Sequence, residues 1–117
     1  NIIEMTQQMI ADDLELSKKG IDDLKKMAEE SLKSVRNCII ALSDNDIDFA
    51  EKVIKEEERV DNLEKQIRGE HMQRLTSGEC NPRVGVIFLD ALTNLERVSD
   101  HALNVAQGVI GANTTKN

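Results

Sequence analysis

Four acidic residues form two Glu-x-x-x-Asp pairs, Glu57/Asp61 and Glu96/Asp100. On a helix, four residues make about one turn, so each pair places two carboxylates on one helix face. The two pairs are equally distant along the chain from a point just after Gly78. If the chain turns there, the two helices run antiparallel and all four carboxylates reach the same height. Such an arrangement would form an oxygen site for a cation.

Carboxylates at one height repel one another, so either solvation or a bound cation must offset the repulsion. Oxygen ligands suit Mg, Ca, Mn or Fe, with Zn also possible. The alternative is a solvated acidic helix face, because 22 of the 117 residues are acidic and such pairs arise by chance. The Glu-x-x-His pattern of di-iron bundle enzymes is absent, since Arg68 and Val98 stand three residues before the two histidines.

The charge of the chain, formally −7, is concentrated in one segment. Residues 44–64 contain nine acidic and three basic residues, and the rest of the chain is close to neutral. This distribution argues against nucleic-acid binding and favours a cation or a basic partner surface. The longest apolar run, residues 84–89, is far too short to insert into a membrane. No phosphate loop or nucleophile motif is present, so we expect no enzymatic activity.

Apolar residues recur three or four positions apart in three long segments, which predicts three long helices. The first carries Ile10, Leu14, Ile21, Leu24, Met27, Ala28, Leu32, Val35, Ile39 and Leu42; the second runs from Ile47 to Leu75; the third begins at Pro82 and continues to about Val109. Gly20, within the first segment, indicates a kink or a close contact. Cys38 is expected in the core, and Cys80 at a helix start in a structural role.

The turns between these segments carry the residues that helix ends require. Asp44 or Asp46 can cap the second helix, and Gly78 can adopt the left-handed conformation that ends it. Asn81 and Pro82 are typical of the start of the third. Long helices joined by short turns pack up-down-up, so the fold class is all-α, an antiparallel three-helix bundle.

The segment LERVSDHALNVA, residues 95–106, resembles the signature of the PhoU family, L-E-R-I-G-D-H-A-x-N-I-A. EERVDNLEKQI, residues 57–67, resembles the matching motif of the preceding helix, and the resemblance covers about residues 10–110. It implies a three-helix bundle whose acidic motifs bind an iron or zinc cluster and which regulates phosphate uptake. Glu57, Asp61, Glu96 and Asp100 are the metal ligands that it implies. Ser99 departs from the usual glycine, but its small side chain is expected to preserve close helix packing.

Stand-alone PhoU proteins contain two such units, and this chain has the length of one. The segment HMQRLTSGECNPRVGVIFLDALTNLERVSDHA, residues 71–102, looks most like the unit at the cytoplasmic C-terminus of bacterial sodium/phosphate cotransporters. We therefore expect a connector at residues 1–9, the PhoU-like domain at 10–111 and a frayed tail at 112–117.

This interpretation predicts a cytoplasmic regulatory domain that the transporter portion of the same chain tethers to the inner face of the plasma membrane. It also predicts that the domain forms a homodimer, which would recreate the paired units. Two alternatives remain open. The chain could be a stand-alone PhoU-type regulator of a phosphate-uptake system, or a helical scaffold and dimerisation module that binds no metal.

Overall fold

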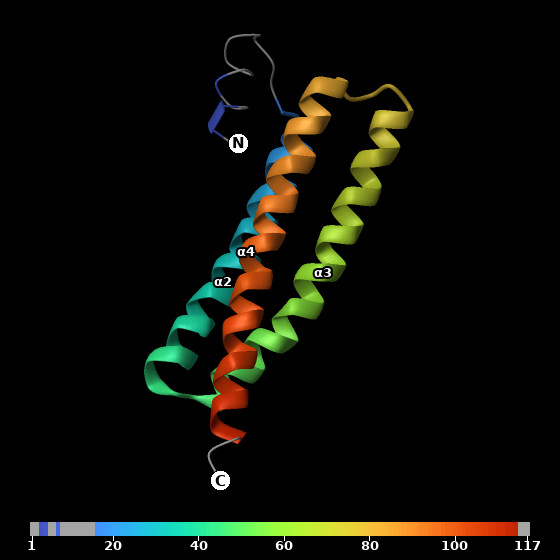
Figure 1. The fold of residues 1–117 in the computed structure, drawn as a ribbon. Coiled ribbons are helices and arrows are strands. Elements are labelled where there is room, and N and C mark those ends of the chain that lie inside the picture. Colours follow the sequence, from blue (N-terminus) through green and yellow to red (C-terminus); the bar gives the residue numbers. More distant parts are fainter. Residues whose placement is uncertain (1–2, 5–6, 8–15, 115–117) are drawn as a thin grey trace.

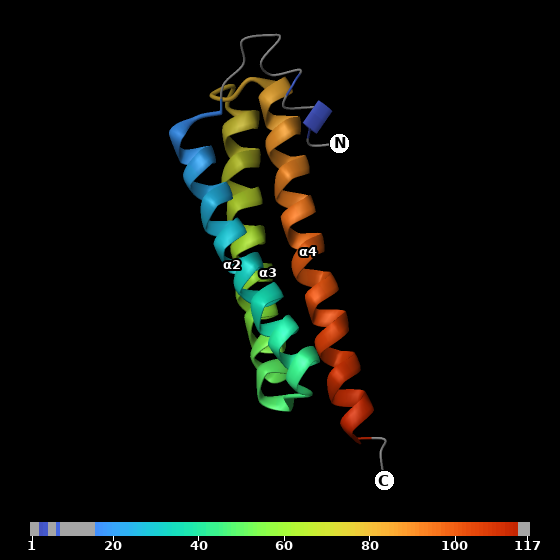
Figure 2. The same ribbon diagram turned by 90° about the vertical axis from the view of Figure 1, so that its left-hand side faces the viewer.

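The computed structural model describes residues 3–4, 7 and 16–114, and its helices form an antiparallel three-helix bundle. The helices are α2 (Lys18–Asp44), α3 (Ile47–Thr76) and α4 (Pro82–Thr114). The turn between α2 and α3 and the turn between α3 and α4 lie at opposite ends of the bundle (Figure 1). Each helix packs against the other two, and in the turned view all three run side by side (Figure 2). The predicted fold class is confirmed.

The two turns contain the residues that the sequence predicted. Asn45 ends α2 in the left-handed region at φ 51°, and Asp46 then caps α3 by accepting hydrogen bonds from the amides of Asp48 (2.9 Å) and Phe49 (3.3 Å). Gly78 follows α3 at φ 80°, a conformation that costs glycine little. The Asn81 carboxamide accepts a hydrogen bond from the amide of Arg83 (2.9 Å) at the start of α4.

The first helix begins later than the apolar pattern predicted. Ser17 has extended backbone angles and caps α2, because its hydroxyl accepts a hydrogen bond from the amide of Gly20 (3.0 Å). The predicted start near Ile10 lies outside the described residues, as does most of the expected connector at residues 1–9. Gly20 marks a close contact, since an added Cβ would stand 3.2 Å from the Ser17 hydroxyl and 3.5 Å from the ring of Phe88.

The last helix continues further than predicted. Residues 112–114, expected to be frayed, form the last turn of α4. Asn113 explains the difference, because its side chain exchanges hydrogen bonds of 3.0 and 2.7 Å with Asn45 and donates another to the Val109 carbonyl. The turn after α2 thereby holds the end of α4 in place.

The core consists of two aliphatic clusters at successive heights of the bundle. The cluster nearer the α3–α4 turn contains Met27, Val60, Ile67, Phe88 and Leu92. The cluster nearer the other end contains Cys38, Ala41, Ala50, Val53, Ala102, Ala106 and Val109. Cys38 is thus in the core, as expected. Between the clusters, α4 carries the second acidic motif, so the bundle interior supports that motif from both sides.

The buried face of α2 is only partly the face that the apolar pattern predicted, since Met27 is buried and Leu24 and Val35 pack against the core. Its buried residues are Gly20, Asp23, Met27, Ser31, Ser34, Cys38 and Ala41. Four aliphatic residues assigned to the core are instead exposed, at 40% for Ile21, 55% for Leu32, 59% for Ile39 and 62% for Leu42. The prediction was wrong because it followed the largest apolar side chains, whereas α2 turns mostly small and polar side chains toward α3 and α4.

Candidate functional site

The antiparallel arrangement of α3 and α4 brings the two acidic motifs together. Glu57 and Asp61 come from the middle of α3, and Glu96 and Asp100 from the middle of α4. Glu57 lies close enough to Asp100 for the two carboxyl groups to interact, and oxygen atoms of Asp61 and Glu96 lie within 4.8 Å of each other. The juxtaposition inferred from equal distances to the turn is therefore what the fold produces. Whether these residues bind a metal stays a prediction.

Glu57 has the most strongly perturbed carboxyl group of the site. Burial is the largest cause, followed by the hydrogen bond with Asp100, and these effects raise the pKa of Glu57 from 4.5 to about 7. Ser99 acts in the opposite direction, because its hydroxyl donates a hydrogen bond of 3.0 Å to Glu57 Oε2. Near neutral pH, Glu57 therefore keeps its proton in a substantial fraction of the molecules.

Glu64 belongs to the same cluster, although the equal-distance pattern did not select it. Asp61, Glu64 and Glu96 each offer an oxygen atom, and these atoms lie within 4.8 Å of one another. Burial, followed by a hydrogen bond with Glu64, raises the pKa of Glu96. The position of Glu64 in the sequence could have indicated that it belongs to the site. It lies about one turn beyond Asp61 and forms an acidic stripe with Asp61 and Glu57 beside the core.

Two basic side chains partly neutralise the cluster. Arg68 pairs through Nε with Glu64, and its Nη2 donates a hydrogen bond of 3.0 Å to the Thr93 hydroxyl on α4. Lys65 Nζ lies 3.1 Å from Asp61 Oδ2. The Lys65 side chain is 70% exposed, so its pair with Asp61 contributes little to stability. The Arg68 pair matters more, because Glu64 is only 6% exposed and needs a partner for its charge.

Ser99 lies on α4 and faces α3 within the site. It is completely buried, and its hydroxyl reaches across to Glu57. The serine therefore fills the position usually occupied by glycine and also orients one carboxylate. This confirms that a small residue suffices for the packing there.

The histidines lie apart from the carboxylates. His101 is exposed and borders an apolar groove with Val35 and Val105. His71 is buried near the end of α3, against Phe88. The cluster thus offers carboxylate oxygens, which are the ligands of hard and borderline divalent cations.

A three-helix bundle whose second and third helices place acidic motifs side by side has the architecture expected of a PhoU-like domain. The chain belongs to the PhoU domain family, whose model matches residues 24–109. The match spans parts of all three helices and includes every acidic residue of the cluster.

Curated relatives agree with this assignment. The phosphate-specific transport system accessory protein PhoU homolog 1 of Thermotoga maritima is 32% identical over 97 residues, which are 83% of this chain and 42% of the relative. The homolog of Clostridium acetobutylicum is 29% identical over 118 residues, 96% of this chain and 52% of the relative. The chain spans about half the length of these curated relatives. No solved structure matches the chain.

The described helices are long, and each carries many charged residues. None of them combines the length and the apolar character needed for a membrane span.

Proposed function

We propose that this chain is a metal-binding regulatory unit of the PhoU type that acts in phosphate uptake. The observation that carries the proposal is the carboxylate cluster between α3 and α4, in which Glu96 is paired closely with Glu64 and Asp61, with oxygen atoms within 4.8 Å of one another, and Glu57 with Asp100. Such pairs are costly at neutral pH, where carboxyl groups are normally ionised. A cation bound among them would turn this repulsion into attraction.

The residues present fit a divalent cation. Glu57, Asp61, Glu96 and Asp100 supply oxygen ligands from two helices, and Glu64 adds a fifth carboxylate close to Asp61 and Glu96. Iron and zinc, the metals that the family resemblance implies, both accept carboxylate ligands. Bound there, the metal would supply positive charge that ties α3 to α4, and the pair of Arg68 with Glu64 would hold one ligand in place.

The comparisons support a regulatory role in phosphate transport. The relatives are named as accessory proteins of phosphate-specific transport systems, which favours the stand-alone regulator over the cotransporter domain. We propose that the chain acts without catalysing a reaction, in the cytoplasm, on a membrane-bound phosphate-uptake system. Metal or phosphate status would reach that partner through contacts of the bundle surface.

The outward face of α2 supports a homodimer. The exposed residues Ile21, Leu32, Ile39 and Leu42 lie on α2, and Val98 and Val105 extend the apolar surface onto α4. Two shallow apolar grooves, bordered by residues of both helices, follow this face. A second copy would cover these side chains and would also supply the second three-helix unit that relatives of twice the length could contain.

Elemental analysis of the purified chain tests the metal. Iron or zinc near stoichiometry is expected in the wild type and should be lost in the double variant Glu57→Gln/Asp100→Asn. The double variant Glu58→Gln/Asp22→Asn removes the same two charges from exposed positions and should retain the metal. If neither metal is found in the wild type, even after reloading, the metal site is refuted and a helical interaction module remains.

Oligomeric mass tests the dimer separately. The double variant Leu32→Glu/Ile39→Glu places two charges on the exposed face of α2 and should convert a dimer into a folded monomer. A wild type that sediments as a monomer at all accessible concentrations would refute the dimer without affecting the metal site.

A further inference from the structure

A cavity of about 330 Å³ lies at the end of the bundle where α2 begins, α3 ends and α4 begins. Its walls include Ser17 and Gly20 from the start of α2, His71 and Arg74 from α3, and Asn81 and Phe88 from the start of α4. Arg74 is ten residues beyond Glu64 on α3, roughly 15 Å along the helix axis. The cavity is therefore separate from the carboxylate cluster.

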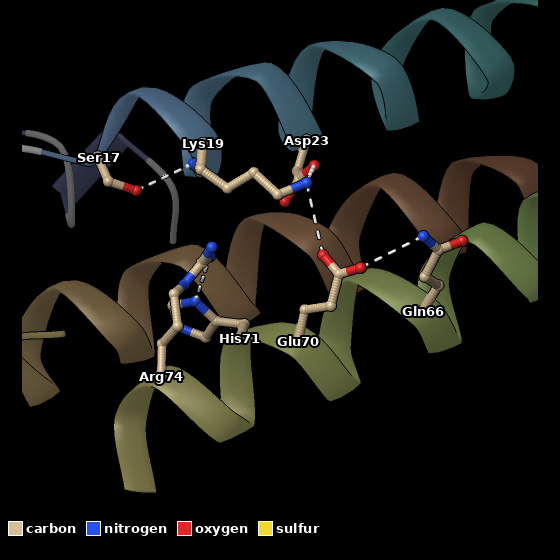
Figure 3. Close-up of polar contacts among 8 residues, drawn as sticks. Ser17, Lys19, Asp23, Gln66, Glu70, His71 and Arg74 are labelled. Atoms are coloured by element: carbon tan, nitrogen blue, oxygen red, sulfur yellow. Dashed lines mark hydrogen bonds and ion pairs between the residues drawn. The ribbon is translucent and has the colours of Figure 1, made fainter. Parts of the chain in front are cut away.

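Arg74 contributes a positive charge that acts on the nearby Glu70 without forming an ion pair with it. Its side chain is half-buried, and its guanidinium contacts the Nδ1 atom of His71 at 3.4 Å (Figure 3). Among the described residues, no carboxylate forms an ion pair with it. The nearby Glu70 is engaged elsewhere, since it lies 3.4 Å from Lys19 Nζ and accepts a hydrogen bond of 3.3 Å from Gln66. Most of the five N–H donors of Arg74 thus remain available to a ligand.

His71 provides a second, independent indication of a ligand. Its side chain is only 2% exposed, and its ring stacks on Phe88 with centroids 4.2 Å apart. The Nε2 atom has no hydrogen-bond partner among the described residues. Burial, and then the charge of Arg74, lower the pKa of His71, so the ring is neutral at neutral pH. With Arg74 donating to Nδ1, the ring proton belongs on Nε2, in the wall of the cavity, where the Gly85 backbone and the charge of Asp23 also act on the ring.

Two helix N-termini meet at the same cavity. α2 begins at Lys18 after Ser17, and α4 begins at Pro82 after Asn81, both beside the end of α3 (Figure 1). Helix N-termini carry partial positive charge and unpaired amide donors, which favour anions. Glu79 is the acidic residue in the lining, and it is exposed. The buried Asp23 adds a second negative charge near His71, and Lys19 Nζ, 2.9 Å from Asp23 Oδ1, offsets it.

We propose that this cavity binds a tetrahedral oxyanion of the phosphate class. Arg74 would bind it by charge-assisted hydrogen bonds, with the His71 N–H as a further donor. The Ser17 and Asn81 caps already accept from the amides of Gly20, Arg83 and Gly85, so the helix starts would contribute mainly their partial positive charge and the remaining first-turn amides. Such an ion would neutralise Arg74 and satisfy the buried donor. The same chemistry serves free phosphate and the phosphate group of a larger molecule. This site does not depend on the metal cluster, so refuting one of the two proposals does not refute the other.

The test is a titration of the full chain with inorganic phosphate, followed by amide NMR shifts and calorimetry. Glu57→Gln/Asp100→Asn protein kept in chelator is used, so that no metal at the carboxylates can bind the anion. We expect saturable shifts at the amides of residues 18–20 and 83–85. Arg74→Gln should weaken binding at least tenfold. Arg36→Gln, which removes an exposed arginine from α2, should leave it unchanged.

The proposal is overturned if phosphate causes no saturable shifts at the cavity, if Arg74→Gln binds as tightly as its parent, or if chloride binds equally well. If Arg74→Gln fails to fold by circular dichroism, Arg74→Lys replaces it, because lysine keeps the charge but loses the planar fork. That variant should bind several-fold more weakly. Titration with glycerol 3-phosphate distinguishes free phosphate from the phosphate group of a larger molecule. If glycerol 3-phosphate binds more tightly than inorganic phosphate, the site is assigned to a phosphate monoester. If it binds more weakly, the site is assigned to the free ion.

Discussion

Burial and the neighbouring Asp100 make Glu57 favour its uncharged form, and glutamine at position 57 would be uncharged at every pH. In the metal-free protein, Glu57 keeps its proton up to about pH 7, whereas the unfolded chain loses it near pH 4.5. Folding therefore takes up a proton between these pH values. The stability of the metal-free protein should fall as the pH rises through this window, and Glu57→Gln should remove that loss.

The size of the effect follows from the pKa of Glu57. The shift from 4.5 to about 7 corresponds to about 3.4 kcal/mol if it is taken in full. Glu57 is half-buried, and solvent screens part of the interaction, so about 1–1.5 kcal/mol is the expected gain at pH 8. For a chain of this length, that gain raises the melting temperature by roughly 4–8 °C. At pH 5 the difference between variant and wild type should be close to zero.

Urea unfolding in the presence of a chelator, followed by circular dichroism at pH 5 and pH 8, measures this effect. Glu58→Gln removes the same charge from an exposed position one residue away, and it should change stability by less than about 0.5 kcal/mol at either pH. If Glu57→Gln is no more stable than the wild type at pH 8, or gains the same at both pH values, the account of the Glu57 proton is incorrect.

Three further predictions concern packing, and thermal or urea unfolding checks each. Gly85→Ala should destabilise the protein by about 1–3 kcal/mol, because the new Cβ would stand 2.5 Å from Leu75 Cδ2. Gly69→Ala is the control and should be neutral or stabilising, because no atom lies within 4 Å of the new Cβ. Equal losses of stability in the two variants would contradict the described packing around Gly85. Glu56→Ala should cost about 1–3 kcal/mol by leaving the side chains that donate to this buried carboxylate without an acceptor, so an unchanged midpoint would disprove that role. Phe88→Ala should cost about 3–5 kcal/mol, and a loss below 1 kcal/mol would show that the ring is not in the core.

Sequence reasoning was most successful where local chemistry determines structure. The left-handed Gly78, the cap at Asp46 and the start at Pro82 each reflect a preference of a single residue, so the turns and the fold class could be predicted. The meeting of Glu57 with Asp100 followed from these turns, because a known turn point fixes which residues of antiparallel helices face each other. Glu64 was missed because its counterpart on α4, at the same distance from the turn, is Thr93. Threonine has no carboxylate, so the two positions do not form an acidic pair.

The rest depended on contacts between distant residues. The inner face of α2 could not be predicted, because hydrophobic periodicity identifies an apolar stripe but not what the stripe contacts. The cavity at the end of the bundle was also missed. His71 appeared in the sequence as an isolated histidine, and only the fold places it beside Arg74, Phe88 and two helix starts.

The small side chains on the inner face of α2 have a consequence for mutational tolerance. Ser31 and Ser34 are at most 1% exposed and the inner face holds Gly20 and Ala41 besides, so α2 lies close to its neighbours and leaves little room for larger groups. A systematic substitution scan of the isolated domain should show an inverted hydrophobicity profile along this helix. Leucine would be rejected at the serines, while polar residues would be accepted at Leu32, Ile39 and Leu42. If hydrophobic residues are nevertheless required at these three positions in the cell, the requirement would come from a surface that is buried only in an assembly.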